Sequence, residues 1–100
     1  MGLCVALKSA SGEQMNFIAD EHNLLDTLLG YPDWKAFPML ASIDRYGDTT
    51  FNRMQIKHFL DEWSSLFARA KNEEERELLE AVRSLGEQQG DLQYLTFIGD

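Results

Sequence analysis

The chain has 100 residues and a formal net charge of −8 at pH 7, because 17 Asp and Glu outnumber 9 Lys and Arg. With 44% hydrophobic residues it is too apolar to be disordered, and its length predicts a single domain, residues 1–100. The negative charge would repel nucleic acid and anionic membranes, so neither is an expected partner. The lone cysteine, Cys4, excludes an intramolecular disulfide, and with no apolar run of spanning length we expect a cytoplasmic protein.

The first third of the chain predicts a β-hairpin followed by a short helix. Residues 3–8 and 13–18 each alternate apolar and polar side chains, and the stretch "SASG" between them is typical of a turn. Residues 20–30 then place four leucines on one helical face. We expect Asp20 to cap this helix and Gly30 to end it.

Both prolines lie in the next segment, and they indicate irregular structure. Pro32 predicts the start of a one-turn helix, while Pro38 excludes a longer one because it lacks an N–H and clashes with the preceding turn.

From Asn52 onward the pattern becomes that of the main core helix. One continuous apolar stripe runs along it, formed by Ile56, Phe59, Leu60, Trp63, Phe67 and Ala70.

A second helix and a closing strand complete the predicted fold. Asn72 followed by Glu75 is the pattern of a capping box, and the leucines and valine at residues 78–85 are expected to face inward until Gly86 or Gly90 ends the helix. The final stretch "LQYLTFIGD" predicts a strand that pairs with the hairpin. The expected class is α+β, with a small antiparallel sheet of hairpin and C-terminal strand packed against two or three helices.

The stretch "DRYGDTTFNRMQ", residues 44–55, admits two interpretations. As a calcium loop it would supply Asp44, Asp48 and Asn52 as ligands, but Tyr46 stands at the third position and an uncharged Gln55 at the twelfth. As the start of a helix it explains more, because Asn52 and Gln55 form a capping box and "RYGD" forms a turn. In that turn we expect Gly47 to adopt positive φ and Asp48 to bond the following backbone.

Two segments, "IDRYGDTTFNRMQ" and "YLTFIGD", resemble a family of small bacterial proteins of unassigned function. That family carries an N-terminal hairpin, an I-D-x-Y-G-D-T-x-F-N-x-x-Q segment and a terminal F-I-G-D. The resemblance covers these two segments and the overall length. It implies a bacterial cytosolic origin and a shared fold, and it assigns no catalytic role to Asp44, Asp48 or Asn52.

The residues offer little for catalysis. His22 and His58 are the only histidines, and His58 with Glu62 is expected to form a pair on the solvent side of the main helix. No phosphate-binding glycine loop or HExxH motif is present, and no cofactor is expected. An enzyme centred on Asp44, Asp48 and His58 is therefore the third interpretation, and a non-enzymatic protein is preferred.

The preferred function is an acidic protein-interaction module of the immunity-protein or inhibitor type, with a basic protein as partner. The alternative is a small-ligand or metal-binding protein that uses the loop 44–55. Partner contacts are expected at two places, the loop and an acidic helical face at i, i+4 and i+7. The expected partner-binding residues are Asp44, Tyr46, Asp48, Glu73, Glu77 and Glu80.

Overall fold

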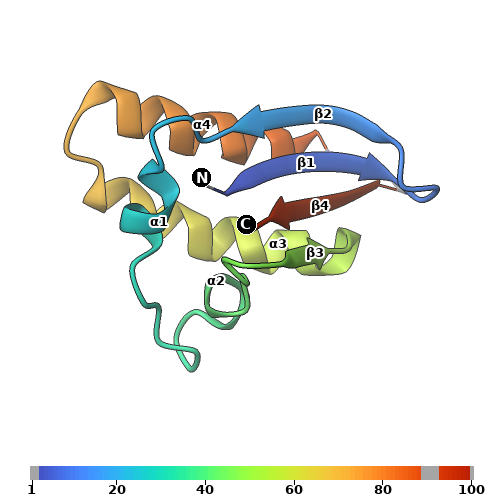
Figure 1. Ribbon diagram of the computed structural model, residues 1–100. Helices are drawn as coiled ribbons and strands as arrows, with labels where there is room; N and C mark the ends of the chain where they lie inside the picture. The colour runs from blue at the N-terminus through green and yellow to red at the C-terminus, as the bar shows by residue number, and fades with distance from the viewer. Residues whose placement is uncertain (1–2, 89–92, 100) are drawn as a thin grey trace.

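The computed structural model describes residues 3–88 and 93–99. Within them, strands β1 (Cys4–Ser9), β2 (Gln14–Ala19), β3 (Asp48–Phe51) and β4 (Gln93–Ile98) form one antiparallel sheet in the order β2-β1-β4-β3 (Figure 1). The helices are α1 (Leu24–Leu29), α2 (Pro38–Ala41), α3 (Arg53–Trp63), the 3₁₀ segment η1 (Ser64–Arg69) and α4 (Glu73–Glu87). The predicted α+β class is confirmed. None of the described helices has the length and apolar composition that crossing a membrane requires.

The sheet contains the predicted hairpin and closing strand, and one further strand. β1 pairs with β2 on one side and with β4 on the other, where Val5 lies opposite Phe97. The expectation that residues 48–51 form a loop was wrong, because they form β3 and pair with β4. This strand has only four residues, and its partner follows more than forty residues later in the sequence. It was therefore not predicted from a local alternation of apolar and polar residues.

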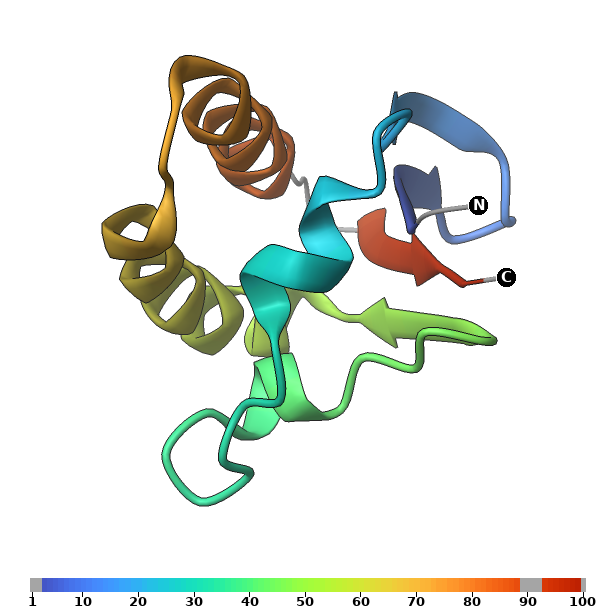
Figure 2. The same cartoon turned by 60° about the vertical axis from the view of Figure 1, so that its left-hand side comes forward.

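The helices and the sheet form two layers with the core between them. α4 contacts β1 and β2, whereas α3 contacts β3 and β4. Figure 2 shows these helices on one side of the sheet, with α1 lying across one end of the two layers. Alternate strand residues such as Val5, Leu95 and Phe97 point into the core and are fully buried, as the period of a strand requires.

Four aromatic rings form the centre of the core. The rings of Phe59 and Phe51 have centroids 5.0 Å apart, and Phe59 also lies 5.2 Å from Trp63 and 5.5 Å from Phe97. The indole nitrogen of Trp63 donates a hydrogen bond of 3.1 Å to the carbonyl of Leu79 on α4, so its burial leaves no polar group unpaired. The predicted stripe is confirmed as far as Trp63.

Beyond Trp63 the helical repeat changes. The chain continues as η1 rather than as α-helix, with three residues per turn in place of 3.6. Leu66 is consequently buried, whereas Phe67, which the α-helical period placed on the stripe, is only partly buried. The prediction of one uninterrupted α-helix to Ala70 was therefore wrong in its last turns.

α4 begins as predicted but does not end as predicted. The side chain of Asn72 accepts a hydrogen bond of 2.9 Å from the N–H of Glu75, while the Glu75 carboxylate accepts from the N–H of Lys71 rather than from Asn72 itself. Gly86 lies inside the helix, where a Cβ would stand 3.0 Å from a methyl carbon of Leu60 on α3. This glycine allows close packing of the two helices instead of ending one, and Gly90 lies outside the described residues.

The short helix α2 depends on a carboxylate that sequence spacing did not assign to it. α2 begins at Pro38, which occupies its first turn, so the one-turn helix expected at Pro32 was misplaced. The carboxylate of Glu62 on α3 accepts hydrogen bonds of 3.0 Å from the N–H groups of Met39 and Leu40. Glu62 therefore caps α2, a role that the expected pairing with His58 did not anticipate.

Candidate functional site

The turn that precedes β3 is held by the side chain of Asp44. One carboxylate oxygen accepts the N–H of Tyr46 at 2.8 Å, and the N–H of Asp44 donates to the hydroxyl of Thr49 at 2.8 Å. The predicted turn thus forms around Asp44 rather than Asp48. Gly47 does not adopt the expected positive φ; it is required for space, because a Cβ there would lie 2.7 Å from the other oxygen of Asp44.

Gly99 packs directly against this turn. Its N–H donates a hydrogen bond of 2.6 Å to the carbonyl of Gly47, and a Cβ at position 99 would stand 2.5 Å from the backbone of Arg45. The pairing of β3 with β4 brings the two together. The two segments whose motifs carry the family resemblance are therefore neighbours in space.

The three calcium-ligand candidates do not converge. Asp44 lies in the turn, Asp48 begins the extended strand β3, and the Asn52 side-chain oxygen accepts the N–H of Gln55 at 2.9 Å. Gln55 returns the bond to the N–H of Asn52 at 3.0 Å, which confirms the predicted capping box. A four-residue rise in a strand separates Asp48 from Asn52 by about 13 Å. Within residues 3–88 and 93–99, no three His, Cys, Asp or Glu side chains group as a metal site requires.

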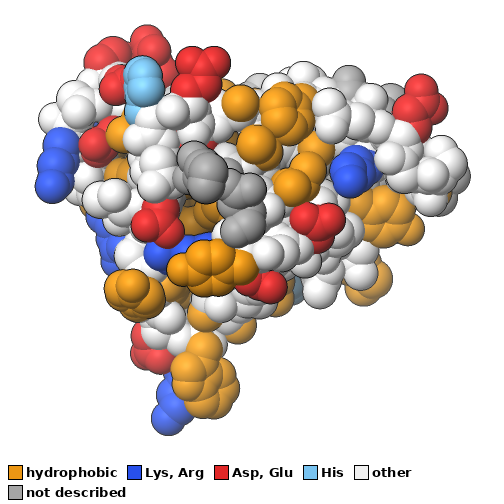
Figure 3. Space-filling view, viewed as in Figure 1, with side chains coloured by type: hydrophobic (Ala, Val, Ile, Leu, Met, Phe, Trp, Pro, Cys, Tyr) orange, Lys and Arg blue, Asp and Glu red, His pale blue; other side chains and the backbone are white. Residues whose placement is uncertain are grey.

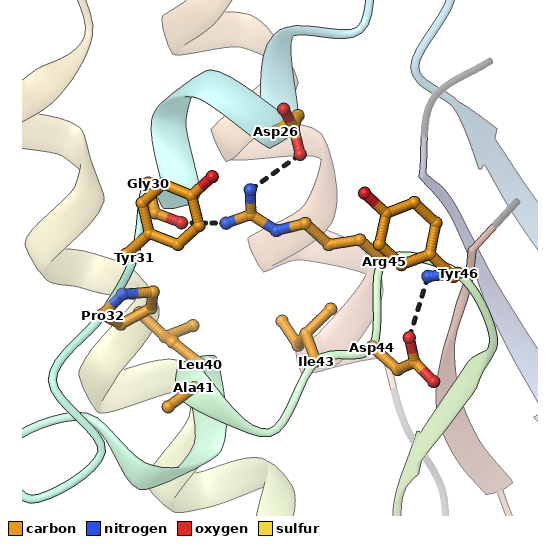
Figure 4. Close-up of a pocket in the computed structure, with 10 residues that line it drawn as sticks. All are labelled: Asp26, Gly30, Tyr31, Pro32, Leu40, Ala41, Ile43, Asp44, Arg45 and Tyr46. Atoms are coloured by element: carbon orange, nitrogen blue, oxygen red, sulfur yellow. Dashed lines mark hydrogen bonds and ion pairs between the residues drawn. The ribbon is translucent and has the colours of Figure 1, made fainter.

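A surface hollow of about 390 Å³ opens beside this turn, and the Arg45 side chain crosses it (Figure 4). Its guanidinium donates to a carboxylate oxygen of Asp26 at 2.7 Å and also bonds the carbonyl of Gly30. The Tyr31 ring lies 5.2 Å from the same guanidinium. We call this cavity the Arg45 hollow; its lining consists of Asp26, Gly30, Tyr31, Pro32, Leu40, Ala41, Ile43, Asp44, Arg45 and Tyr46.

Arginines from two distant segments hold the end of α1 at the hollow. Arg69, at the end of η1, donates to the carbonyls of Leu28 at 3.0 Å and Leu29 at 3.3 Å, while Arg45 bonds that of Gly30. These carbonyls belong to the last two residues of α1 and to its C-cap, Gly30, where helices lack internal partners. The two arginines thereby fix where the chain leaves α1 and enters the segment that carries Tyr31.

Three large aromatic side chains on this side of the molecule are exposed. Tyr31 is 97% exposed, Trp34 69% and Tyr46 85%. In Figure 3, hydrophobic side chains stand out along the lower left of the molecule, where the segment between α1 and α2 projects. We call Tyr31, Trp34 and Tyr46 the aromatic face. Of these three residues, only Tyr46 was predicted to bind a partner; the aromatic-rich segment that holds both prolines was the signal that could have found Tyr31 and Trp34.

The acidic face predicted on α4 lies elsewhere. Glu73, Glu77 and Glu80, which we call the acidic strip, are all exposed, and Glu80 forms an ion pair with Arg83. Figures 1 and 2 both place α4 at the opposite end of the molecule from α2 and the segment before it. The structure thus separates the two sets of predicted partner-binding residues.

His22 joins the acidic end of α4 to the segment before α1. Its Nδ1 forms an ion pair with the carboxylate of Glu74, and in Figure 3 acidic side chains surround a histidine at the upper left. The hydrogen bond and charge of Glu74 raise the pKa of His22 above its ordinary value of 6.5. Both side chains are exposed, so this contact is a surface ion pair.

The residues of the enzyme interpretation are not brought together. His58 lines a different hollow, with Arg53, Met54 and Lys57 on the exposed side of α3, whereas Asp44 lines the Arg45 hollow.

Comparisons with protein-family models, curated proteins and solved structures find no match to this chain. The family resemblance therefore stays a prediction.

Proposed function

We propose that this protein is a non-enzymatic interaction module of the immunity-protein or inhibitor type, and that it binds a basic protein through the aromatic face and the Arg45 hollow. The observation that carries this proposal is the exposure of Tyr31, Trp34 and Tyr46 at 97%, 69% and 85%. Tyrosine and tryptophan bury large areas at little cost in conformational entropy, and they are enriched among residues that dominate interface energies.

The charge of the chain supports a basic partner. The net charge is −8, and Asp33 and Asp44 are exposed in the segments that carry the aromatic face. A negative surface accelerates encounter with a positive protein over about one Debye length, roughly 8 Å at physiological salt. In this proposal the aromatic face provides contacts that slow dissociation, and the acidic strip acts on the rate of association from a distance.

Partner binding by surface variants tests the proposal. The immobilised protein captures a basic protein from a bacterial lysate, and the purified pair is then measured by surface plasmon resonance. Tyr31→Ala, Trp34→Ala and Tyr46→Ala combined should abolish retention. Glu73→Gln, Glu77→Gln and Glu80→Gln combined should slow association at low salt and leave the dissociation rate unchanged, because exposed rim charges act on encounter.

The matched control removes exposed hydrophobic side chains elsewhere. Phe17 is 43% and Met54 77% exposed, and neither belongs to the aromatic face. Phe17→Ala with Met54→Ala should bind as the unmodified chain does. The buried Trp63 reports through its fluorescence whether each variant is folded. A partner held equally well by the triple aromatic variant would contradict the proposal.

A small-ligand or metal-binding protein is the second candidate, and the Arg45 hollow favours its small-ligand form. Its volume of about 390 Å³ is within the range of ligand sites, and Asp44, Arg45 and Tyr46 of the loop 44–55 line it. We do not expect the loop to bind a metal ion, because the side-chain oxygen of Asn52 already accepts a hydrogen bond in the helix cap. Millimolar calcium should leave the melting temperature unchanged, and a rise of several degrees would favour a metal site.

A further inference from the structure

We infer that the Arg45 hollow receives an arginine side chain of the partner, stacked on the ring of Tyr46 and paired with the carboxylate of Asp44. The inference rests on the proposed function and specifies the chemistry of its contact. It comes from three features of the described residues, namely the cations beside the aromatic rings, the carboxylates of the lining and the apolar floor.

The aromatic face already holds cations of its own chain at two of its three rings. The Arg45 guanidinium lies 5.2 Å from the Tyr31 ring, and the Lys35 ammonium lies 5.7 Å from the Trp34 ring. No Lys or Arg among residues 3–88 and 93–99 occupies this position at Tyr46, which is 85% exposed. The Tyr46 ring is thus the one on this face whose negative π surface remains available to a cation from outside.

The charges around the hollow favour a second cation. Asp26 and Asp44 line it with Arg45, which leaves one negative charge in excess among these three residues. The guanidinium of Arg45 is occupied by Asp26 and Gly30, so it does not neutralise Asp44. One oxygen of Asp44 accepts the N–H of Tyr46, and its other oxygen accepts no hydrogen bond from the described residues.

The floor of the hollow suits a long side chain with an apolar stem. Figure 4 shows Ile43, Leu40 and Ala41 below the Arg45 side chain, with Tyr31 and Tyr46 at its two ends. Methylene groups of an entering side chain would cover these apolar atoms while the charged head reaches Asp44 and Tyr46. Arginine fits better than lysine because a planar guanidinium stacks on an aromatic ring and its fork of donors matches a carboxylate.

Small amides test this chemistry without the partner. N-acetyl-arginine amide, its neutral isostere N-acetyl-citrulline amide and N-acetyl-lysine amide are titrated into the full chain, and the tyrosine ring signals are followed by NMR. The arginine amide should shift the Tyr46 and Tyr31 signals saturably at millimolar concentration. Citrulline amide should bind more weakly than the arginine amide, by a factor of up to about five, since exposed cation–π contacts and ion pairs each contribute modestly.

Variants assign the effect to the two contacts. Asp44→Asn keeps an oxygen for the N–H of Tyr46, so the turn is preserved, and it should weaken arginine binding about two- to fivefold. Tyr46→Phe should retain binding, whereas Tyr46→Leu should lose it. Glu87→Gln, which removes one charge from an exposed position in the last turn of α4 outside the acidic strip and the hollow, is the matched control and should leave binding unchanged.

Several outcomes would overturn the inference. If citrulline amide bound as tightly as the arginine amide, the charge would have no role in binding. If lysine amide bound as tightly, the planar guanidinium would have none. Shifts spread over the acidic surface and unaffected by Asp44→Asn would indicate non-specific attraction. If a captured partner needs the aromatic face but arginine amide does not bind the hollow, this inference fails and the proposed function stands.

Discussion

The helices α3 and α1 are built in opposite ways. α3 begins with a capping box made by its own residues, Asn52 and Gln55, and it buries an aromatic stripe. α1 has six residues, and its N-cap residue Asn23 lies in the left-handed region at φ 55° without a side-chain cap bond. So short a helix is not stable alone in water. The contrast teaches that α3 begins with a cap made at its own N-terminus, whereas α1, although it buries Leu25, Leu28 and Leu29, depends on side chains outside the helix to bind both of its ends.

The ends of α1 are bound by three side chains from outside the helix. Asp20 accepts hydrogen bonds of 2.8 Å from the N–H of Leu24 and 2.7 Å from that of Leu25. Its carboxylate therefore does the capping that the sequence predicted for it, although three residues separate it from the helix. Arg45 and Arg69 bind the other end. The Arg45 hollow is thus positioned by tertiary contacts rather than by a rigid local motif.

The largest expected effect tests the α3 side of the comparison. Phe59→Ala should lower the free energy of unfolding by about 3–5 kcal/mol, because Phe59 is fully buried against three other rings and leaves a cavity. Urea denaturation followed by the fluorescence of Trp63 measures it. Phe59→Leu, which fills more of the space, should be milder. A loss below about 1 kcal/mol would mean that the core is not centred there.

The next largest effect tests the α1 side. Asp20→Ala should lower the free energy of unfolding by about 1.5–3 kcal/mol, because two N–H groups lose a charged acceptor and one of them is buried. It should also change the fluorescence of Trp34, which follows α1 in the chain, while leaving that of Trp63 intact. Relative to the unmodified chain, the exchange rate of backbone amide hydrogens should increase more in α1 than in α3. Equal exchange in both helices would contradict the distinction drawn between them.

The cap of α3 should contribute less. Asn52→Ala should reduce stability by about 0.5–2 kcal/mol through loss of the bond to the N–H of Gln55. Asn52→Asp retains an accepting oxygen and serves as the control, with little change expected. Thermal unfolding of both variants measures the difference. If Asn52→Ala destabilised more than Asp20→Ala, local capping would dominate in both helices.

The smallest effect concerns the exposed ion pair of His22 and Glu74. Because the pKa of His22 is raised above 6.5 in the folded chain, its contribution to stability is fully present below pH 6.5 and is lost as the pH rises through the folded pKa. His22→Gln should therefore lower the melting temperature slightly at about pH 5.5 and not at about pH 8.5. Glu74→Gln should remove the same pH dependence. A difference that persists at the higher pH would assign another role to His22.

Within the candidate site, the sequence predicted the members that act locally. The capping box of Asn52 with Gln55 and the polar turn before it follow from spacing alone, and both are present. It did not predict the Arg45 hollow, because Asp26 and Arg45 are nineteen residues apart and neither is unusual in its neighbourhood. Nor did it predict β3, whose hydrogen bonds are made with a strand far along the chain.

What the sequence by itself determined is the hairpin, the closing strand and the capped starts of the two long helices. Each of these carries its signal within a window of one element, as alternation, a 3.6-residue stripe or a cap at fixed spacing. Only the tertiary structure decided that Pro38 rather than Pro32 begins α2, that Gly86 lies inside α4 and that Tyr31 and Tyr46 flank one hollow. The reason is that each of these depends on a side chain from another segment, Glu62, Leu60 and Arg45 respectively, whose distance in space the sequence does not contain.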